Sequence, residues 1–251
     1  MTDHILVERP EAYPGVQVIR FARPEKKNAI TRDMYAKMTR ALTVAAQDDA
    51  VRATAFLGTE GCFSAGNDMA DFMAFAMGGT MGQEVVEFLR ALATTVKPVV
   101  SGVDGLAIGI GTTIHLHCDM TIASTRSLFK TPFVDLALVP EAASSLIAPR
   151  IMGHQRAFAL LAAGEGFSAE EAKDAGIIWK VSEPESIEAE TLALAASLAA
   201  KPPQALKIAR DLIRGGPQAV LARIEEEAVH FAAQLKSAEA RAAFEAFMRR
   251  K

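Results

Sequence analysis

Two glycine-rich segments contain residues whose types and spacing are typical of catalytic or ligand-binding loops. The first, GCFSAGND, covers residues 61–68, and the second, DGLAIGIG, covers residues 104–111. The outer glycines of the first have the spacing of a nucleotide P-loop, but Asn67 and Asp68 stand where Lys and Ser/Thr would be, and an acid there repels phosphate. Glycine instead frees the backbone, so that an amide such as that of Asn67 can point into a cavity as a hydrogen-bond donor.

The second segment ends at Ile110 and Gly111, where a helix is predicted to begin. Unpaired N–H groups and the positive end of the helix dipole favour negative charge at such a start. Taken alone, either segment is most simply a tight turn between a strand and a helix. If the two turns meet, their amides predict an oxyanion hole.

Carboxylates near these segments are candidate acids and bases. Glu141 follows Pro140, and taken alone it fits the first turn of a helix, where an acid interacts favourably with the dipole. Asp68 is predicted to support its own loop through hydrogen bonds to main-chain N–H groups. Asp135 is either a second polar group of the site or a surface residue, and we favour the surface.

The elements that position these residues alternate between strands and helices. Apolar residues at 34, 38, 41, 42 and 45 fall on one face of a 3.6-residue period, so a helix is predicted over 32–47 with Thr31 as its cap. Further elements are predicted as strands over 16–21, 51–57 and 120–123, from Val99 and near Phe129, and as helices over 82–95 and from Pro140. This pattern indicates an α/β fold with its function in the loops.

The last quarter of the chain reads as helices alone. They are predicted over 186–199, 203–214, 218–235 and 238–249, with Pro and Gly at their joints. An oligomer contact is expected there, because a short terminal array cannot bury all of its own apolar face. That face includes Leu206, Ala209, Leu212 and Ile213.

Composition narrows the classes of function. The 251 residues carry 27 Lys and Arg against 30 Asp and Glu, a net charge of −3, so no basic excess is present to bind nucleic acid. No signal peptide and no uninterrupted bilayer span is visible. Two cysteines are too few for a disulfide framework, which favours a reducing compartment. His115 and His117 are two residues apart, not the three or four of a helical metal pair. A cytoplasmic protein without a metal, nucleic-acid or membrane partner is predicted.

An ordered set of motifs resembles the crotonase (enoyl-CoA hydratase/isomerase) superfamily. The motifs are RPEKKNAIT, FSAGNDM, KPVVSGVDGLAIGIG, CDMTIAS, FKTPFVDLALVPEAASSLIAPRIMG and GFSAEEAKDAGIIWKVSE. The resemblance implies a crotonase-like spiral of strand-strand-helix (ββα) units over residues 1–185. It also implies a helical region over 186–251 that forms a homotrimer or a dimer of trimers. The implied partner is an acyl-CoA thioester held between the glycine turns, with coenzyme A entering as part of the substrate and no separate cofactor.

The resemblance also assigns roles to individual residues. The oxyanion donors fall on the backbone N–H groups of Asn67 and Ile110, within turns that include Ala65, Gly66, Gly109 and Gly111. The loop of Arg23, Lys26 and Lys27 would lie along the CoA moiety, where cations suit its phosphates. The other implied contacts to the acyl chain or CoA are Asp68, Met69, Phe72, Phe133, Phe247 and Arg250.

The methionines after the first turn recur every four residues. Met69, Met73, Met77 and Met81 fit one helix face, with Phe72 and Phe75 nearby. Such a face is either core packing or a flexible acyl-chain pocket. The sequence leaves both interpretations open.

Departures from the hydratase pattern point to one particular reaction. The two positions that carry glutamates in the hydratases are Thr113 and Phe133 here, and neither residue is a general base. The PE..SS pattern resembles the peroxisomal-type Δ3,Δ2-enoyl-CoA isomerases, whose catalytic glutamate falls on Glu141. That reaction needs one base, which removes a C2 proton and returns it to C4. The alternatives are an enoyl-CoA hydratase, an isomerase of a ring-derived acyl-CoA, and a non-catalytic acyl-CoA-binding scaffold.

Overall fold

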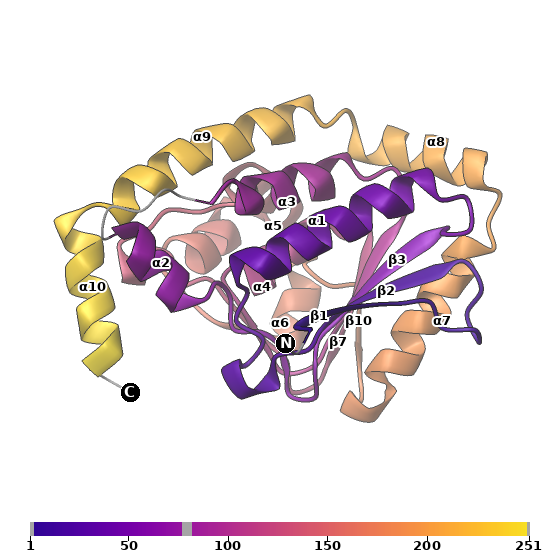
Figure 1. The fold of residues 1–251 in the computed structure, drawn as a ribbon, viewed down its shortest axis with the longest axis horizontal. Helices are drawn as coiled ribbons and strands as arrows, with labels where there is room; N and C mark the ends of the chain where they lie inside the picture. The colour runs from indigo at the N-terminus through magenta and orange to yellow at the C-terminus, as the bar shows by residue number, and fades with distance from the viewer. Residues whose placement is uncertain (1–2, 77–81, 250–251) are drawn as a thin grey trace.

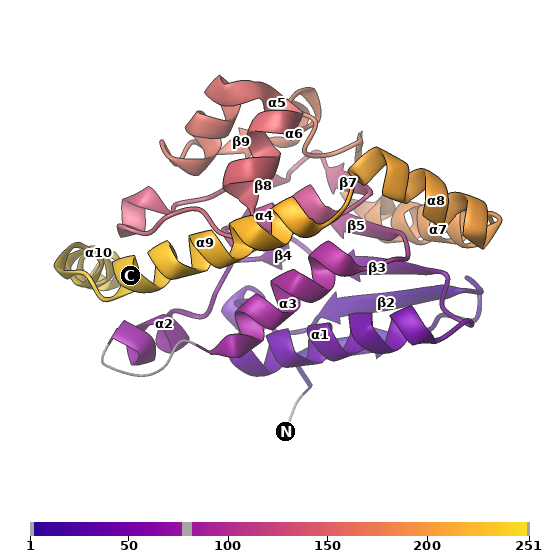
Figure 2. The ribbon, with the colours of Figure 1, turned by 90° about the horizontal axis from the view of Figure 1, so that it is seen from above.

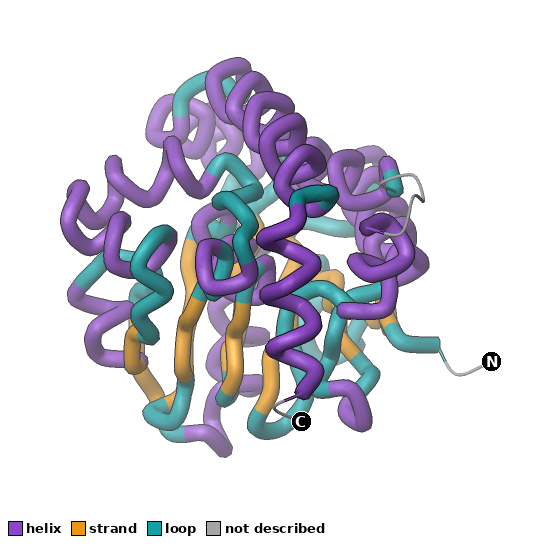
Figure 3. The backbone as a smooth tube through the Cα atoms, turned by 90° about the vertical axis from the view of Figure 1, so that its left-hand side faces the viewer, coloured by secondary structure: helices purple, strands orange, loops and turns teal. Residues whose placement is uncertain are grey.

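Strands and helices alternate through the first 182 residues. The structure is a computed structural model that describes residues 3–76 and 82–249 (Figure 1). Two sheets lie at its centre, and helices cover them (Figure 3). The predicted α/β class is therefore confirmed.

The larger sheet has six strands in the order β1-β2-β3-β5-β7-β10. All of its neighbouring pairs are parallel except β1 with β2. The strands are β1 (Ile5–Glu8), β2 (Val16–Phe21), β3 (Ala53–Leu57), β5 (Val99–Val103), β7 (Met120–Ser124) and β10 (Lys180–Ser182).

The smaller sheet has four short strands in the order β4-β6-β8-β9, in which β8 and β9 are antiparallel. They are β4 (Cys62–Ser64), β6 (Leu106–Ile108), β8 (Leu128–Lys130) and β9 (Phe167–Ser168). Three times in succession, a strand of the larger sheet is followed by a strand of the smaller sheet and then by a helix. The strand pairs are β3–β4, β5–β6 and β7–β8. This is the predicted spiral of ββα units.

Ten α-helices lie within the described residues. Their bounds are α1 (Arg32–Gln47), α2 (Met69–Ala76), α3 (Gln83–Thr94), α4 (Ile110–Thr113), α5 (Ser144–Leu161), α6 (Ala169–Asp174), α7 (Ile187–Ala199), α8 (Pro203–Arg214), α9 (Gln218–Leu235) and α10 (Ala238–Arg249). Short 3-10 turns occupy Pro24–Lys26, Ile114–His117, Val134–Leu136 and Pro184–Ser186. No helix of the described chain has the length and apolar content to cross a membrane.

Both faces of the larger sheet are buried. Val18 belongs to a small cluster with Leu192 and Ala195 of α7, whereas the next residue, Ile19, belongs to the main core. This alternation follows from the two-residue period of a strand, and it makes the strand apolar on both sides. The sheet is thus a rigid base from which the loops project.

The four predicted C-terminal helices are confirmed as α7 to α10 and lie against the rest of the chain. Helix α7 packs on β3 and β5, and α9 contacts α3 and α5. Seen from above, α9 crosses the molecule between these two helices (Figure 2). The C-terminal region is therefore part of the packing around the loops as well as a surface.

Candidate active site

The two glycine-rich turns touch each other backbone to backbone. Gly66 has φ +88°, and a Cβ there would lie 2.8 Å from the carbonyl oxygen of Ile108 and 3.9 Å from the Cα of Gly109. A Cβ at Gly111 would lie 2.7 Å from the carbonyl oxygen of Ser64. Glycine is required at these points because any side chain would push the turns apart.

Two main-chain N–H groups, of Asn67 and Ile110, lie where the turns meet and have no acceptor in the part of the chain that the structure describes. Ile30 donates to the carbonyl of Gly66 at 2.8 Å and accepts from the N–H of Asp68 at 2.9 Å. Because peptide groups alternate along an extended chain, the N–H of Asn67 points away from Ile30. Ile110 is the first residue of α4, where an N–H has no partner within the helix. Within the described residues, neither N–H has a hydrogen-bond acceptor.

Glu141 lies in the turn before α5 and faces α4. Its side chain is buried, and its Oε1 accepts a hydrogen bond of 2.5 Å from the hydroxyl of Thr113. Its Oε2 is buried without a partner among the described residues. Thr113 follows Ile110 by three residues, about one helical turn or ~4.5 Å along the axis. Helix α4 therefore places the free N–H of Ile110 and the carboxyl of Glu141 near each other.

The local structure around Glu141 differs from the sequence prediction. The expected helix from Pro140 begins only at Ser144, and Ala142 and Ala143 have left-handed backbone with φ 61° and 53°. The interpretation of Glu141 as an acid in a first helical turn was therefore wrong. Nothing in two alanines signals a left-handed pair, because non-glycine residues rarely adopt that conformation.

Burial changes the acidity of Glu141. Removal from water disfavours the carboxylate and raises the pKa of Glu141 to about 8. The hydrogen bond from Thr113 lowers this pKa, and the negative charge of Glu227 raises it. A base whose pKa lies near neutral pH can both accept and return a proton.

Tyr35 supports the first turn from α1 and was missed by the sequence analysis. Its hydroxyl donates to Oδ1 of Asn67 at 2.5 Å, and its side chain is buried. Burial, followed by the charges of Glu141 and Asp71, raises the pKa of Tyr35 well above 10, so the phenol remains a donor. In the sequence, Tyr35 lies beside the apolar positions of a predicted helix. That position does not indicate that its hydroxyl binds Asn67.

Asp68 and Asp135 lie as predicted. Asp68 Oδ1 accepts from the N–H of Ala70 at 2.9 Å, which closes the loop on itself. Its other oxygen binds Arg23 Nη1, so the charge of Arg23 is already paired within the protein. Asp135 is exposed.

The two lysines assigned to coenzyme A lie beside the first glycine turn. Lys26 and Lys27 are exposed at the end of a 3-10 turn. The carbonyl of Lys27 accepts from the N–H of Ala65 at 2.8 Å, which fixes this loop against the turn. The main chain of Lys27 is therefore fixed next to the first glycine turn, and the assignment of the two lysines to coenzyme A stays a prediction.

The remaining predicted contacts vary in their surroundings. Phe133 is buried in the main core, Met69 packs against that core at the start of α2, and Phe247 is 38% exposed on α10. The side chains of Phe72 and Phe75, together with Met77, Met81 and Arg250, lie outside the described residues. Of the four methionines expected on one helix face, the structure therefore describes Met69 and Met73, and Met73 is 39% exposed.

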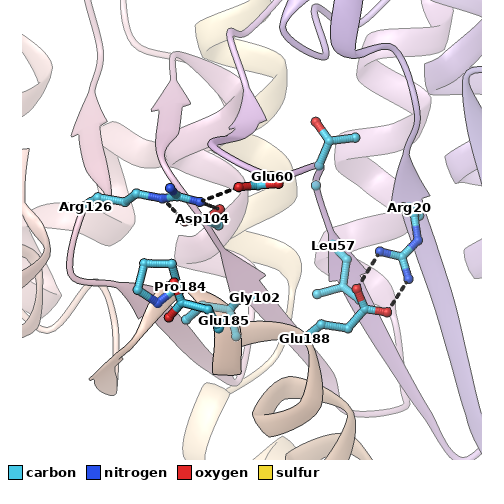
Figure 4. Close-up of a pocket in the computed structure, with 12 residues that line it drawn as sticks. Arg20, Leu57, Glu60, Gly102, Asp104, Arg126, Pro184, Glu185 and Glu188 are labelled. Atoms are coloured by element: carbon cyan, nitrogen blue, oxygen red, sulfur yellow. Dashed lines mark hydrogen bonds and ion pairs between the residues drawn. The ribbon is translucent and has the colours of Figure 1, made fainter.

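A hollow of about 330 Å³ lies near the carboxyl ends of β2, β3 and β5, beside the start of α7, and holds none of the predicted site residues (Figure 4). Its Arg126 binds Asp104 at 2.6 Å, and its Arg20 binds Glu188 at 2.7 Å. Because carboxylates of the protein already pair with both arginines, this hollow offers no free cation to an anionic ligand. The turns around Glu141 are the better candidate.

Known proteins resemble this chain both in sequence and in structure. The family model for enoyl-CoA hydratase/isomerase matches residues 11–251. Rat "Enoyl-CoA delta isomerase 2" is 36% identical over 219 residues, covering 85% of the chain but 56% of that relative. The chain therefore spans little more than half of that relative's length. "1,2-epoxyphenylacetyl-CoA isomerase" of Escherichia coli K12 is 32% identical over 205 residues, covering 79% of the chain and 78% of the relative. The crystal structure of an enoyl-CoA hydratase/isomerase from Pseudoalteromonas atlantica T6c superposes with a TM-score of 0.91 at 36% identity, covering 99% of the chain and 98% of that structure.

Proposed function

The chain belongs to the enoyl-CoA hydratase/isomerase family, and from this premise we propose that it moves the double bond of a 3-enoyl-CoA to the 2-position. The observation that carries the proposal is Glu141, a buried carboxyl with one oxygen bound by Thr113 and the other unpartnered among the described residues. Its pKa of about 8 suits a group that takes a proton and gives it back. A single base of this kind meets the needs of isomerisation.

The proposed reaction proceeds in two proton transfers. Glu141 removes a proton from C2 of the thioester, and the electrons of the broken C–H bond form a dienolate over C1 to C4. The N–H groups of Asn67 and Ile110 stabilise its oxygen, and each such donor typically contributes about 3 to 4 kcal/mol in the transition state. The protonated Glu141 then delivers the proton to C4, leaving the double bond between C2 and C3. No water is consumed.

Hydration fits the same residues less well. Adding water requires groups that orient the water and deliver a proton, and the two hydratase positions hold Thr113 and Phe133. The Thr113 hydroxyl is already donated to Glu141, and Phe133 is buried in the core. Neither residue can replace the missing glutamates.

An isomerase of a ring-derived acyl-CoA is the second candidate. It is favoured by the 32% identity to the Escherichia coli relative named 1,2-epoxyphenylacetyl-CoA isomerase. Such a substrate would use the same two N–H groups for its thioester oxygen. The two candidates differ in the acyl group that is carried on coenzyme A.

The remaining assignments are also proposals. Lys26 and Lys27 would interact with the phosphates of coenzyme A, and Phe247 with its adenine end. The region 186–251 would form the contacts of a homotrimer or a dimer of trimers. An acyl-CoA-binding scaffold without activity is the alternative outside the enzymes.

A substrate panel tests the proposal. The wild type and Glu141→Ala are incubated with a 3-enoyl-CoA, crotonyl-CoA and a ring-derived epoxide thioester. Added water is detected by mass spectrometry, and isomers are distinguished by chromatographic retention and by the absorbance of the conjugated 2-enoyl thioester. We expect a 2-enoyl-CoA of unchanged mass from the first substrate, and no such product from Glu141→Ala. A gain in mass of one water, independent of Glu141, would instead identify a hydratase. Thioester binding with no turnover would identify a scaffold.

A further inference from the structure

The turn that carries Glu141 needs support from outside itself. Ala142 and Ala143 follow Glu141 with left-handed backbone, a conformation that costs a non-glycine residue about 1 to 2 kcal/mol. Such a turn persists only where surrounding contacts fix it. The direction of the Glu141 side chain therefore depends on what holds the next four residues.

Glu227 of α9 provides most of that support. It is 6% exposed, and its Oε2 accepts a 2.6 Å hydrogen bond from the N–H of Ala143. Its Oε1 accepts from the N–H of Ser145 at 3.0 Å and from the Ser145 hydroxyl at 2.5 Å. These donors lie at the start of α5, where free N–H groups and the helix dipole favour a carboxylate.

Two further contacts complete the support of the turn. Arg223, one helical turn before Glu227, donates to the Ser145 hydroxyl at 2.9 Å. His117 Nε2 lies 2.7 Å from the carbonyl of Ala142, an acceptor, so this nitrogen carries the proton. Burial lowers the pKa of His117 to about 4, which leaves it neutral at physiological pH. Each of residues 142, 143 and 145 is thus held by a side chain from another helix.

We propose that Glu227 is a positioning residue for Glu141. It fixes the left-handed turn so that the Glu141 carboxyl remains against Thr113 with its second oxygen directed to the substrate. The proposal rests on the proposed function of Glu141. It assigns α9 a part in the geometry of the reaction, through a contact between residues 84 positions apart in the sequence.

The test compares two matched glutamate-to-glutamine substitutions in α9. Glu227→Gln replaces one of the two acceptor oxygens with an NH₂ group, so the side chain can no longer accept from the N–H groups of Ala143 and Ser145 through separate oxygens. Glu225→Gln makes the same change of charge two residues away, at an exposed side chain that pairs with Arg90. We expect Glu227→Gln to lower kcat by about tenfold or more, with KM within about threefold, because small displacements of a reacting group are costly. Glu225→Gln should leave both constants unchanged.

A measurement on the free protein separates this proposal from the proposed function. The Glu141 carboxyl is followed by ¹³C NMR against pH, with its signal assigned by its loss in Glu141→Gln. The groups that interact with it are Thr113, Tyr35 and Glu227, and the neutral His117 contacts the next residue, Ala142. Loss of the negative charge of Glu227 should lower the pKa of Glu141, whereas Glu225→Gln should leave it in place. This result does not depend on turnover.

A milder variant covers the case in which Glu227→Gln fails to fold. Ser145→Ala removes one hydroxyl bond to Glu227 and should lower kcat in the same direction by about threefold, with KM unchanged. The proposal is overturned if folded Glu227→Gln has the kcat and the Glu141 titration of Glu225→Gln. Where Glu227→Gln does not fold, it is overturned if Ser145→Ala has the kcat of Glu225→Gln. If the wild type does not isomerise 3-enoyl-CoA but the titration still shifts, the proposed function fails and the positioning contact stands.

Discussion

The hydroxyl of Thr113 controls the acidity of Glu141, which makes Thr113→Val an informative change. Thr113 is fully buried, and its hydroxyl donates to Glu141 Oε1 at 2.5 Å. Valine has nearly the same shape but cannot donate. The hydrogen bond favours the ionised carboxylate, so its loss raises the pKa of Glu141 above its present value of about 8.

The size of this effect follows from the strength of the bond. A hydrogen bond to a charged group contributes about 1.5 to 3 kcal/mol. One pKa unit corresponds to about 1.4 kcal/mol, so the pKa of Glu141 should rise by roughly one to two units. The ionised fraction at pH 7, and with it kcat/KM, should fall by about 10- to 100-fold.

The assay is a pH profile of kcat/KM, followed by the absorbance of the conjugated 2-enoyl thioester. The wild type should reach its plateau above about pH 8, and Thr113→Val about one to two pH units higher. Thr43→Val, whose exposed hydroxyl donates to the carbonyl of Thr39, serves as the control. A Thr113→Val profile that rises at the same pH as the wild type would refute the assignment of Glu141 as the base.

Three further predictions concern the turns, the stability and the surface. Gly66→Ala should lower kcat, as measured by initial rates, by about 10²- to 10³-fold. The added Cβ would approach the Ile108 carbonyl oxygen to 2.8 Å and displace the N–H of Asn67. The folded-state pKa of Glu141, about 8, exceeds its ordinary value of 4.5, so wild-type stability falls as pH rises between these values. Glu141→Gln avoids that loss, and in thermal melts it should raise Tm more at pH 8 than at pH 5. Leu212 and Ile213 are 80% and 86% exposed. Changing both to Glu should dissociate the expected oligomer, which sedimentation velocity measures. An unchanged sedimentation coefficient would place the contact elsewhere.

Local signals account for what the sequence predicted well. Helix α1 begins and ends at the predicted residues, because its apolar positions repeat every 3.6 residues and Thr31 caps it by accepting from the N–H of Met34. The two glycine turns were found because close backbone contact demands glycine itself. Three of the four C-terminal helices were bounded by Pro and Gly, at Pro184, at Pro202 and Pro203, and at Gly215 to Pro217. The joint between α9 and α10 is Lys236 and Ser237 and carries no such signal.

The short strands β1, β4, β6, β9 and β10 were not predicted as strands. They contain two to four residues each, too few for a two-residue alternation to be visible. Their place in the fold is set by pairing with strands far away in the sequence. The residue pattern within a short strand does not indicate which distant strand it pairs with.

The supporting residues of the site were missed for the same reason. Tyr35 acts on Asn67 from 32 residues away, and Glu227 on Ala143 from 84 residues away. Each looks like an ordinary member of an amphipathic helix when it is considered with its neighbours. Their roles depend on tertiary contacts, which bring α1 and α9 against the turns.

The turnover of a 3-enoyl-CoA by Glu141→Gln tests the central claim most directly, with binding of a saturated acyl-CoA measured on the same sample. Glutamine keeps the shape of the side chain but cannot take a proton from C2. We predict that kcat falls by about 10³-fold or more while the dissociation constant changes by less than about threefold. Turnover within about tenfold of the wild type would contradict it, because another group would then have to carry the proton.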